Sequence, residues 1–359
     1  MTTLEPGRLG DLLGVRYPIV QGPFGGGYSS VALAAEVANA GGLGSYGGHI
    51  LTPDGLTTLV AELRAQTDGP FAVNLWVPQP SERDAHWTQA DIDRLRPHYD
   101  KLGVPAPEAP PASPAYADQA EALLAAGPPA MSFVMGIPAP GILAEARRRG
   151  IVTIGTATTV DEALAIEAAG MDAVVASGSD AGGHRGSFLR PVRESLVGTF
   201  SLVPQVADAV GIPVIAAGGI ADGRGVAAAL TLGADAVQVG TGFLATAESN
   251  ASDVHRAALH SADARVTVLT RLFSGRLARG IVNDFIRDMA AHEDDVPAYP
   301  VQNNLMLPIR QAAGARNQPG HVNLWAGQAA ALSRPGHAAE YLRELAAETE
   351  KVLAGRRSR

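Results

Sequence analysis

One histidine within a glycine-rich segment is the residue of this sequence best suited to chemistry. His184 lies in the run S-G-S-D-A-G-G-H-R-G-S-F at 177–188, directly after an apolar stretch at 173–176. Imidazole can accept a proton or donate a hydrogen bond near neutral pH, and neighbouring glycines let a ligand approach the backbone closely. A loop histidine can equally be solvated or structural. We interpret the segment as a pocket floor, with His184 as the candidate base or anion contact.

Two further glycine-rich turns could bind an anion. Gly218 and Gly219 follow the apolar run P-V-I-A-A, and Gly240 and Thr241 follow the run A-V-Q-V. Such turns leave backbone N–H groups uncovered, and a helix that begins after the turn presents its positive end to a phosphate. The turns could also serve tight packing alone. Because there are two of them, expected on neighbouring strands, we predict a phosphate site.

Other candidate ligand contacts lie earlier and later in the chain. Asn74 stands near the end of the apolar run F-A-V-N-L, where an amide could face a ligand or cap the next loop, and the loop G-P-F-G-G-G at 22–27 follows another apolar run. Arg271, Arg276 and Arg310 could face an anionic substrate, although a place on a surface helix is the simpler explanation for each.

The candidate residues follow apolar runs that predict a parallel barrel. Eight such runs alternate with helical segments, and they lack polar alternation, as strands buried on both faces do. The pattern G-x-D-A-V occurs at 170–174 and again at 233–237, two βα units apart. We therefore expect an α/β fold, a (β/α)8 TIM barrel, with its active site at the carboxyl ends of the strands. The expected strands are 18–21, 43–45, 71–75, 131–133, 151–155, 173–176, 213–217 and 236–239.

The barrel is expected to span residues 1–265, with an insertion at about 79–130. The proline-rich segment 104–114 excludes regular structure, and the insertion could form a lid or an exposed loop. Residues 266–333 are expected to form a smaller, mainly helical substrate or lid subdomain over the barrel mouth. Residues 334–359 predict an amphipathic helix packed on the barrel.

Composition excludes several classes of function. The chain has 359 residues, a formal net charge of −8 and no basic patch, which argues against nucleic acid or an anionic membrane as a partner. It has no cysteine, so disulfides and thiolate metal sites are excluded, and we expect no metal. The N-terminal residues lack a basic segment followed by an apolar run, so we expect a cytoplasmic protein that acts on a small molecule as a monomer or homodimer.

The motifs resemble those of the flavin-dependent nitronate monooxygenases, formerly called 2-nitropropane dioxygenases. The resemblance extends from about Pro18 to the late segments L-F-S-G-R at 272–276, Y-P at 299–300 and L-W-A-G-Q at 324–328, and A-G-G-H-R-G-S-F is its most specific motif. It implies that FMN is the cofactor. It also implies that a nitronate, or a nitroalkane, is oxidised with O2 to a carbonyl compound and nitrite, with His184 as the catalytic histidine.

The cofactor contacts that follow from the resemblance and from the glycine loops form one set. Its members are Gly22, Phe24, Asn74, Ser177, Gly182, Gly183, Gly218, Gly219, Gln238, Val239, Gly240 and Thr241. Two of them depart from the family pattern. Ser177 stands where glutamine is usual and Phe24 where methionine is usual, which shortens one expected contact to the flavin and reshapes the cavity above it.

Two other functions compete with this one. An NAD(P)H-dependent flavin reductase, of the quinone or enoyl-acyl-carrier-protein reductase type, shares the barrel and the G-G-H loop. A non-catalytic flavin- or phosphate-binding protein is the alternative from another class. The extended motif G-G-H-R-G-S-F and the late Y-P and W-A-G-Q segments favour the monooxygenase.

Overall fold

The computed structural model describes residues 4–80, 86–111 and 113–357. Among these residues, eight parallel strands form a nearly closed barrel in the order β1-β9-β8-β6-β5-β4-β3-β2. A bridge between Val20 and Leu43 joins β1 to β2. The expected (β/α)8 barrel is thereby confirmed. Its strands are β1 (Ile19–Gln21), β2 (Gly44–Gly47), β3 (Phe71–Trp76), β4 (Ala130–Val134), β5 (Val152–Ala157), β6 (Ala173–Ser177), β8 (Val214–Ala217) and β9 (Ala236–Val239).

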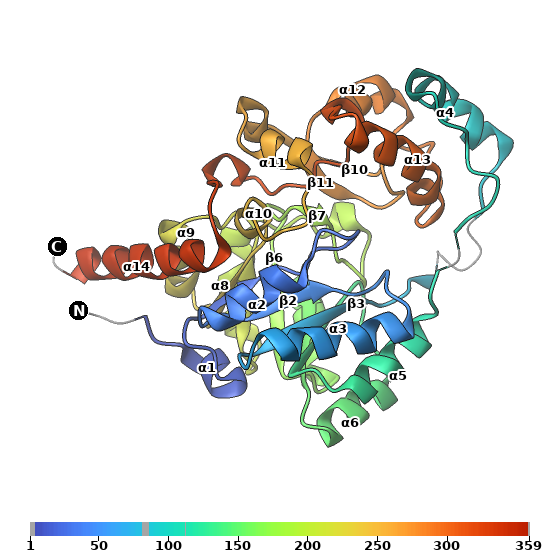
Figure 1. The fold of residues 1–359 in the computed structure, drawn as a ribbon. Coiled ribbons are helices and arrows are strands. Elements are labelled where there is room, and N and C mark those ends of the chain that lie inside the picture. The colour runs from blue at the N-terminus through green and yellow to red at the C-terminus, as the bar shows by residue number, and fades with distance from the viewer. Residues whose placement is uncertain (1–3, 81–85, 112, 358–359) are drawn as a thin grey trace.

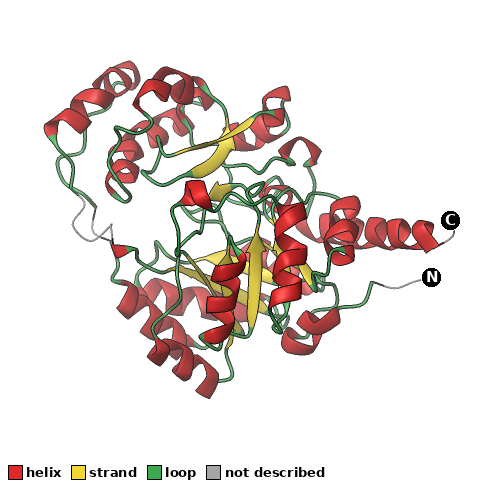
Figure 2. Cartoon of the chain, turned by 180° about the vertical axis from the view of Figure 1, so that it is seen from behind, coloured by secondary structure: helices red, strands yellow, loops and turns green. Residues whose placement is uncertain are grey.

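Helices surround the barrel (Figure 1, Figure 2). Their first residues follow the local sequence: Ser30 Oγ accepts from Leu33 N at the start of one helix, and Thr52 caps another whose first residue is Pro53. Such caps satisfy N–H groups that a helix leaves unpaired at its start. The helices are α2 (Val31–Asn39), α3 (Pro53–Gln66), α5 (Tyr116–Ala126), α6 (Pro140–Arg148), α7 (Val160–Ala168), α8 (Thr199–Ala209), α9 (Gly223–Thr231) and α14 (Ala338–Arg357).

Two apolar layers stabilise the barrel. One lies between strands and helices, where α2 approaches β2 so closely that a Cβ on Gly44 would lie 2.0 Å from Ala34 O. The other cluster draws on alternate residues of the strands, as expected for side chains that point into a barrel. Helix α1 (Gly7–Leu13) adds Leu9 to it. The strand members of this second cluster are Val20, Ala72, Ala130, Ile154, Ala173, Val175, Ile215, Ala217 and Ala236.

A second unit, with its own apolar core, lies beside the barrel (upper part of Figure 1). It contains the helices α11 (Asp253–Leu259), α12 (Asp284–Met289) and α13 (Val301–Ala315). It also contains an antiparallel sheet of β10 (Thr267–Thr270), β11 (Ala278–Ile281) and β7 (Gly183–His184). This sheet is not predictable from the sequence, because β7 is two residues long and its partner β11 is distant in the sequence.

The predicted insertion at about 79–130 is divided between the two cores. Helix α4 (Gln89–Leu102) places Leu95, Tyr99 and Leu102 in the core of the second unit, and Tyr99 Oη donates to Leu305 O of α13 at 2.6 Å. Helix α5 instead packs Leu123 and its neighbours into the barrel core. The insertion therefore does not act as one body, and the domain boundaries given above remain predictions.

Helix α14 packs on the outside of the barrel, against α2 and α9. Its apolar residues Leu342 and Leu345 belong to the barrel core, and Tyr341 Oη donates to Ala221 O at 2.8 Å. Figure 1 shows both ends of the described chain on the same side of the molecule. No helix in the described part of the chain is both long enough and apolar enough to cross a membrane.

Candidate active site

His184 is held at the mouth of the barrel by the sheet of the second unit. Strand β7 pairs with β11 so that His184 lies opposite Ala278, and His184 Nε2 lies 2.8 Å from Ser274 Oγ. The Ser274 hydroxyl also lies 3.1 Å from Arg276 O, to which it can donate while its oxygen accepts from Nε2–H. In this arrangement the neutral ring carries its proton on Nε2 and its lone pair on Nδ1.

Aromatic rings enclose the imidazole of His184. Trp76, the last residue of β3, lies edge-on at 5.1 Å between ring centroids, and Trp325 lies at 5.5 Å. Tyr299 lies at 6.4 Å and also contacts Trp76 at 5.7 Å. The imidazole is therefore surrounded largely by aromatic rings, which disfavour a charge on it and strengthen electrostatic interactions around it.

Two arginines lie close to His184 and the aromatic rings around it. The Arg276 guanidinium lies 4.9 Å from the centroid of Tyr299 and 5.9 Å from that of Trp76. Arg310, on α13, donates through Nη2 to Asn303 O at 3.0 Å and to Asn303 Oδ1 at 2.9 Å. Its Nε is buried without a hydrogen-bond partner in the described part of the chain, where Arg310 also forms no ion pair. The site is therefore electropositive and suited to an anion.

These surroundings keep His184 neutral. Burial, and secondarily the charge of Arg310, lowers the pKa of His184 from 6.5 to about 4. Burial likewise lowers the pKa of Arg276 to about 10, at which the guanidinium remains charged at neutral pH. At pH 7 the site thus combines a neutral imidazole that can accept a proton with cationic side chains that can stabilise an anion.

The two glycine turns lie at the same end of the barrel. Gly218 and Gly219 have φ values of +115° and +67°, and a Cβ on Gly218 would lie 3.0 Å from Ala181 N, in the loop that leads to His184. Across the described residues, the N–H groups of Gly218, Gly219 and Gly240 donate no turn, loop or side-chain hydrogen bond. This cradle, with its unpaired donors, fits a phosphate group.

The helices that follow the two glycine turns were expected to help bind the phosphate through their N-termini, but neither N-terminus is suited to this. The N-terminus of α9 is already capped, because Asp222 accepts from Arg224 N and Gly225 N. The helix after the other turn, α10 (Thr241–Leu244), is a single turn. A carboxylate occupies the place that a phosphate would need at α9, so an anion here would depend on the glycine backbone instead.

The remaining predicted residues lie on the loops around this cradle. Gly22 N donates to Val239 O at 2.9 Å, and Phe24 Cε1 lies 3.9 Å from where a Cβ on Gly240 would be. Thr241 Oγ1 accepts from the N–H of Gly327 at 3.0 Å, in the L-W-A-G-Q segment. The loops after β1 and β9 and the segment around residue 327 therefore meet at one place.

Loop 178–184 meets the same segment. A Cβ on Gly182 would lie 2.5 Å from Gly327 N, so only glycine allows this approach, while beside it Gly183 adopts a φ of +74°. At the end of β6, Ser177 O accepts from Arg185 Nη2 at 2.6 Å, and Arg185 Nη1 lies 3.4 Å from Ser177 Oγ. A buried arginine thus stands beside the serine that replaces the usual glutamine.

Asn74 and Gln238 also lie within the barrel strands. The amide nitrogen of Asn74 donates one hydrogen bond to Ser132 Oγ on β4 at 3.0 Å, which orients the amide. Gln238 is half-buried on β9, in register with Val20 and Ala217.

Most of the residues around His184 were not predicted from the sequence. Trp76 was not singled out, and Ser274, Tyr299 and Trp325 were noted only inside the late segments of the resemblance. For Arg310 a surface position was the simpler expectation, but the residue is buried against the site. The polar and aromatic residues of those late segments are a signal that could have found Ser274, Tyr299 and Trp325, whereas Trp76 and Arg310 lie outside those segments.

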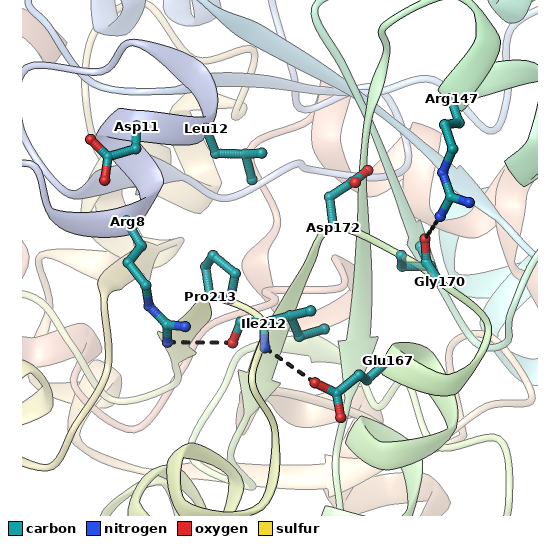
Figure 3. Close-up of a pocket in the computed structure, with 10 residues that line it drawn as sticks. Arg8, Asp11, Leu12, Arg147, Glu167, Gly170, Asp172, Ile212 and Pro213 are labelled. Carbon is teal, nitrogen blue, oxygen red and sulfur yellow. Dashed lines mark hydrogen bonds between the residues drawn. The ribbon is translucent and has the colours of Figure 1, made fainter.

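A hollow of about 560 Å³ at the opposite end of the barrel is not part of this site (Figure 3). It lies before the strands β6 and β8, and three of its charged residues already make hydrogen bonds. Arg8 bonds to Asp235 at 2.7 Å, and Glu167 accepts from Gly211 N at 2.6 Å. Arg147 donates to Gly170 O at 2.9 Å. These contacts tie the amino ends of the strands together, which is a structural role.

Acid is expected to destabilise the fold through its buried histidines. Burial lowers the pKa of His255 to about 4 and that of His49 to about 3, whereas both would titrate near 6.5 in an unfolded chain. Between pH 6.5 and 4 the folded state therefore binds fewer protons than the unfolded state. The free energy of unfolding is at its full value above about pH 6.5 and decreases as the pH falls towards 4. For His255 alone the loss reaches on the order of 3 kcal/mol. Urea unfolding at pH 7 and pH 5 measures it; a higher midpoint at pH 5 would contradict it.

A TIM barrel that gathers two glycine turns and a buried histidine at one rim has the arrangement typical of cofactor-dependent barrel enzymes. Comparison with known proteins gives the family. Residues 7–348 match the sequence profile of the nitronate monooxygenase family. A probable nitronate monooxygenase of Staphylococcus aureus is 42% identical over 332 residues, which cover 91% of this chain and 92% of that protein. The chain belongs to the nitronate monooxygenase family, and it is a flavin-dependent oxidoreductase.

Solved structures agree with this assignment. A nitroalkane oxidase from Streptomyces ansochromogenes is 39% identical with a TM-score of 0.89, covering 97% of this chain and 99% of that one. FabK from Thermotoga maritima is 31% identical with a TM-score of 0.78, covering 98% of both chains.

Proposed function

We propose that the protein uses FMN and O2 to oxidise alkyl nitronates, and nitroalkanes as a second substrate class, to carbonyl compounds and nitrite. The observation that carries the proposal is the buried imidazole of His184 among aromatic rings, beside cationic Arg276 and Arg310. A nitronate is an anion with an alkyl chain, so it matches both the charge and the walls of the site.

The residues at the barrel mouth fit FMN better than a larger cofactor. The unpaired N–H groups of Gly218, Gly219 and Gly240 lie close enough together to match a single phosphate group. When bound, FMN would supply the redox chemistry, taking electrons from the nitronate and passing them to O2. The phosphate would be held by Gly218, Gly219, Gly240 and Thr241, and the rest of the cofactor by Gly22, Phe24, Asn74, Ser177, Gly182, Gly183, Gln238 and Val239.

The chain's own residues would prepare the substrate. With a neutral nitroalkane, the proton on the carbon next to the nitro group moves to His184 Nδ1, and the electron pair of that C–H bond becomes the nitronate charge. Arg276 and Arg310 stabilise that charge, and the rings of Trp76 and Trp325 exclude water from it. A preformed nitronate needs only the stabilisation of its charge, because it has already lost the proton.

The other parts of the proposal concern the protein's setting. We propose a cytoplasmic enzyme that acts as a monomer or homodimer, without nucleic acid or a membrane as partner. The net charge of −8 supports the absence of nucleic acid and anionic membranes as partners, since it gives the chain no general affinity for anionic polymers.

Anaerobic reduction of the bound flavin tests the proposed function against its main competitor. FabK is a relative at 31% identity, so a flavin reductase that uses NAD(P)H is the second candidate. We expect an alkyl nitronate to bleach the flavin absorbance under nitrogen and NADH or NADPH to leave it unchanged over the same period. Bleaching by the nicotinamide and not by the nitronate would overturn the proposal. The absence of any turnover would support a non-catalytic flavin-binding protein.

A further inference from the structure

A histidine outside the predicted site is stacked on its wall. His49, in the loop after β2, lies face to face with Trp76, with 3.8 Å between ring centroids and 4° between the ring planes. Trp76 also makes an edge-on contact with His184, with 5.1 Å between the ring centroids. One indole ring therefore separates the two histidines.

The loop that carries His49 is fixed in place. Gln119, a buried residue of α5, donates through Nε2 to His49 O at 2.9 Å and to Leu51 O at 2.7 Å. On the other side, a Cβ on Gly25 would lie 2.7 Å from His49 Cε1 and 3.0 Å from Trp76 Cζ2. The glycine loop after β1 thus closes the edge of the stack, and Trp76 can rotate only if His49 yields.

The imidazole of His49 contributes to the site through its shape. Burial, followed by the nearby charges of His184 and Arg276, lowers the pKa of His49 to about 3, so the ring is neutral at physiological pH. Its Nδ1 is buried without a hydrogen-bond partner in the described part of the chain. A neutral ring without a polar anchor stacks on the indole as a flat aromatic surface.

We propose that His49 is a positioning residue that fixes the Trp76 indole against His184 and thereby sets the size of alkyl group that the site accepts. The Trp76 indole lies edge-on to the imidazole of His184, and the ring of His49 lies flat on the indole and keeps it from moving away from His184. The statement about alkyl groups rests on the proposed function, whereas the statement about Trp76 does not.

Fluorine NMR tests the position of Trp76 without any substrate. The chain has three tryptophans, at positions 76, 87 and 325, so 5-fluorotryptophan labelling gives three signals that Trp→Phe variants assign. In His49→Ala we expect the Trp76 signal to shift or broaden while the Trp87 signal stays unchanged. His49→Phe keeps an aromatic plate and is expected to restore one sharp Trp76 signal. An unchanged Trp76 signal in His49→Ala, or the same disorder in both variants, would overturn the proposal.

Kinetics with nitronates of increasing chain length test the consequence for the substrate. In His49→Ala we expect KM to rise about two- to tenfold for the short chains, the fold-change of one lost stacked pair, with a smaller effect on kcat. Longer chains should lose less, because a wall that moves outward admits them. His49→Phe should retain the wild-type order of substrates. An equal loss in kcat at every chain length would instead mark His49 as part of the reaction and overturn its positioning role. If the wild-type protein oxidises no nitronate, the proposed function fails, and the NMR result still decides the role of His49.

Discussion

Replacing His184 by Asn is expected to abolish turnover of neutral nitroalkanes while part of the turnover of preformed nitronates remains. Asparagine can keep a hydrogen bond to Ser274 but cannot accept the substrate proton. General-base assistance is typically worth about 10²–10⁴ in rate, so the ratio between the two activities should widen by a factor of that order. Steady-state kinetics on a matched nitroalkane and nitronate, normalised to bound flavin, measures it.

The control for this experiment is Ser274→Ala, which removes the partner of Nε2 but leaves the base in place. We expect that variant to lose less than His184→Asn on the nitroalkane. In wild-type kcat/KM profiles, the nitroalkane activity should fall only as the pH approaches about 4, because the imidazole stays neutral above its lowered pKa. A parallel loss on both substrates would show that His184 binds the anion, and full activity would remove it from the mechanism.

Gly218→Ala is expected to remove the flavin from the folded protein. Alanine is strained at a φ of +115°, and its Cβ would lie 2.6 Å from Thr199 Oγ1 and 3.0 Å from Ala181 N, so the cradle must change shape. Loss of several backbone donors to one phosphate should weaken binding of FMN at least about 100-fold. The measurement is titration of the apoprotein with FMN, together with chromatography of the flavin released on denaturation.

Gly233→Ala is the matched control. Gly233 has a similar φ of +100° but lies before β9, at the far end of the barrel, and a Cβ there would meet only the side chain of Ala207 at 3.0 Å. Both variants should lose roughly 1–2 kcal/mol of stability from the left-handed backbone, and only Gly218→Ala should lose the cofactor. If both bind FMN equally well, the glycine cradle is not the phosphate site.

The strands were predictable because their signal is local. The run A-V-Q-V at 236–239 is both the expected and the observed strand β9, since small apolar residues without alternation are buried on both faces wherever they lie in the barrel. Helix α8 shows the limit of this reasoning. It begins at Thr199, where Asp180 accepts from Thr199 N at 2.7 Å in place of a local cap. Such a cap, supplied from another loop, leaves no trace near the start of the helix.

The site was predictable only in part, for the same reason. His184 lies among glycines that mark it out locally, but the residues that tune it come from three other segments. Trp76 ends a barrel strand, Ser274 follows β10, and Arg310 lies in the third turn of α13. Spacing in the sequence carries no information on these distances, and the burial that lowers the pKa of His184 exists only after the second unit has packed on the barrel.

The packing of α14 also bears on how the protein is made. The ribosome synthesises residues 338–346 after all eight barrel strands, yet Ala338, Leu342 and Leu345 complete the apolar layer over α2 and α9. Until that helix docks, a nascent chain exposes this layer to water, and exposed apolar surface makes such intermediates prone to aggregate. A polypeptide released before residue 338 should therefore depend on chaperones far more than the finished chain. Premature stop codons in this last part of the gene would be damaging even though they spare every residue at the barrel mouth.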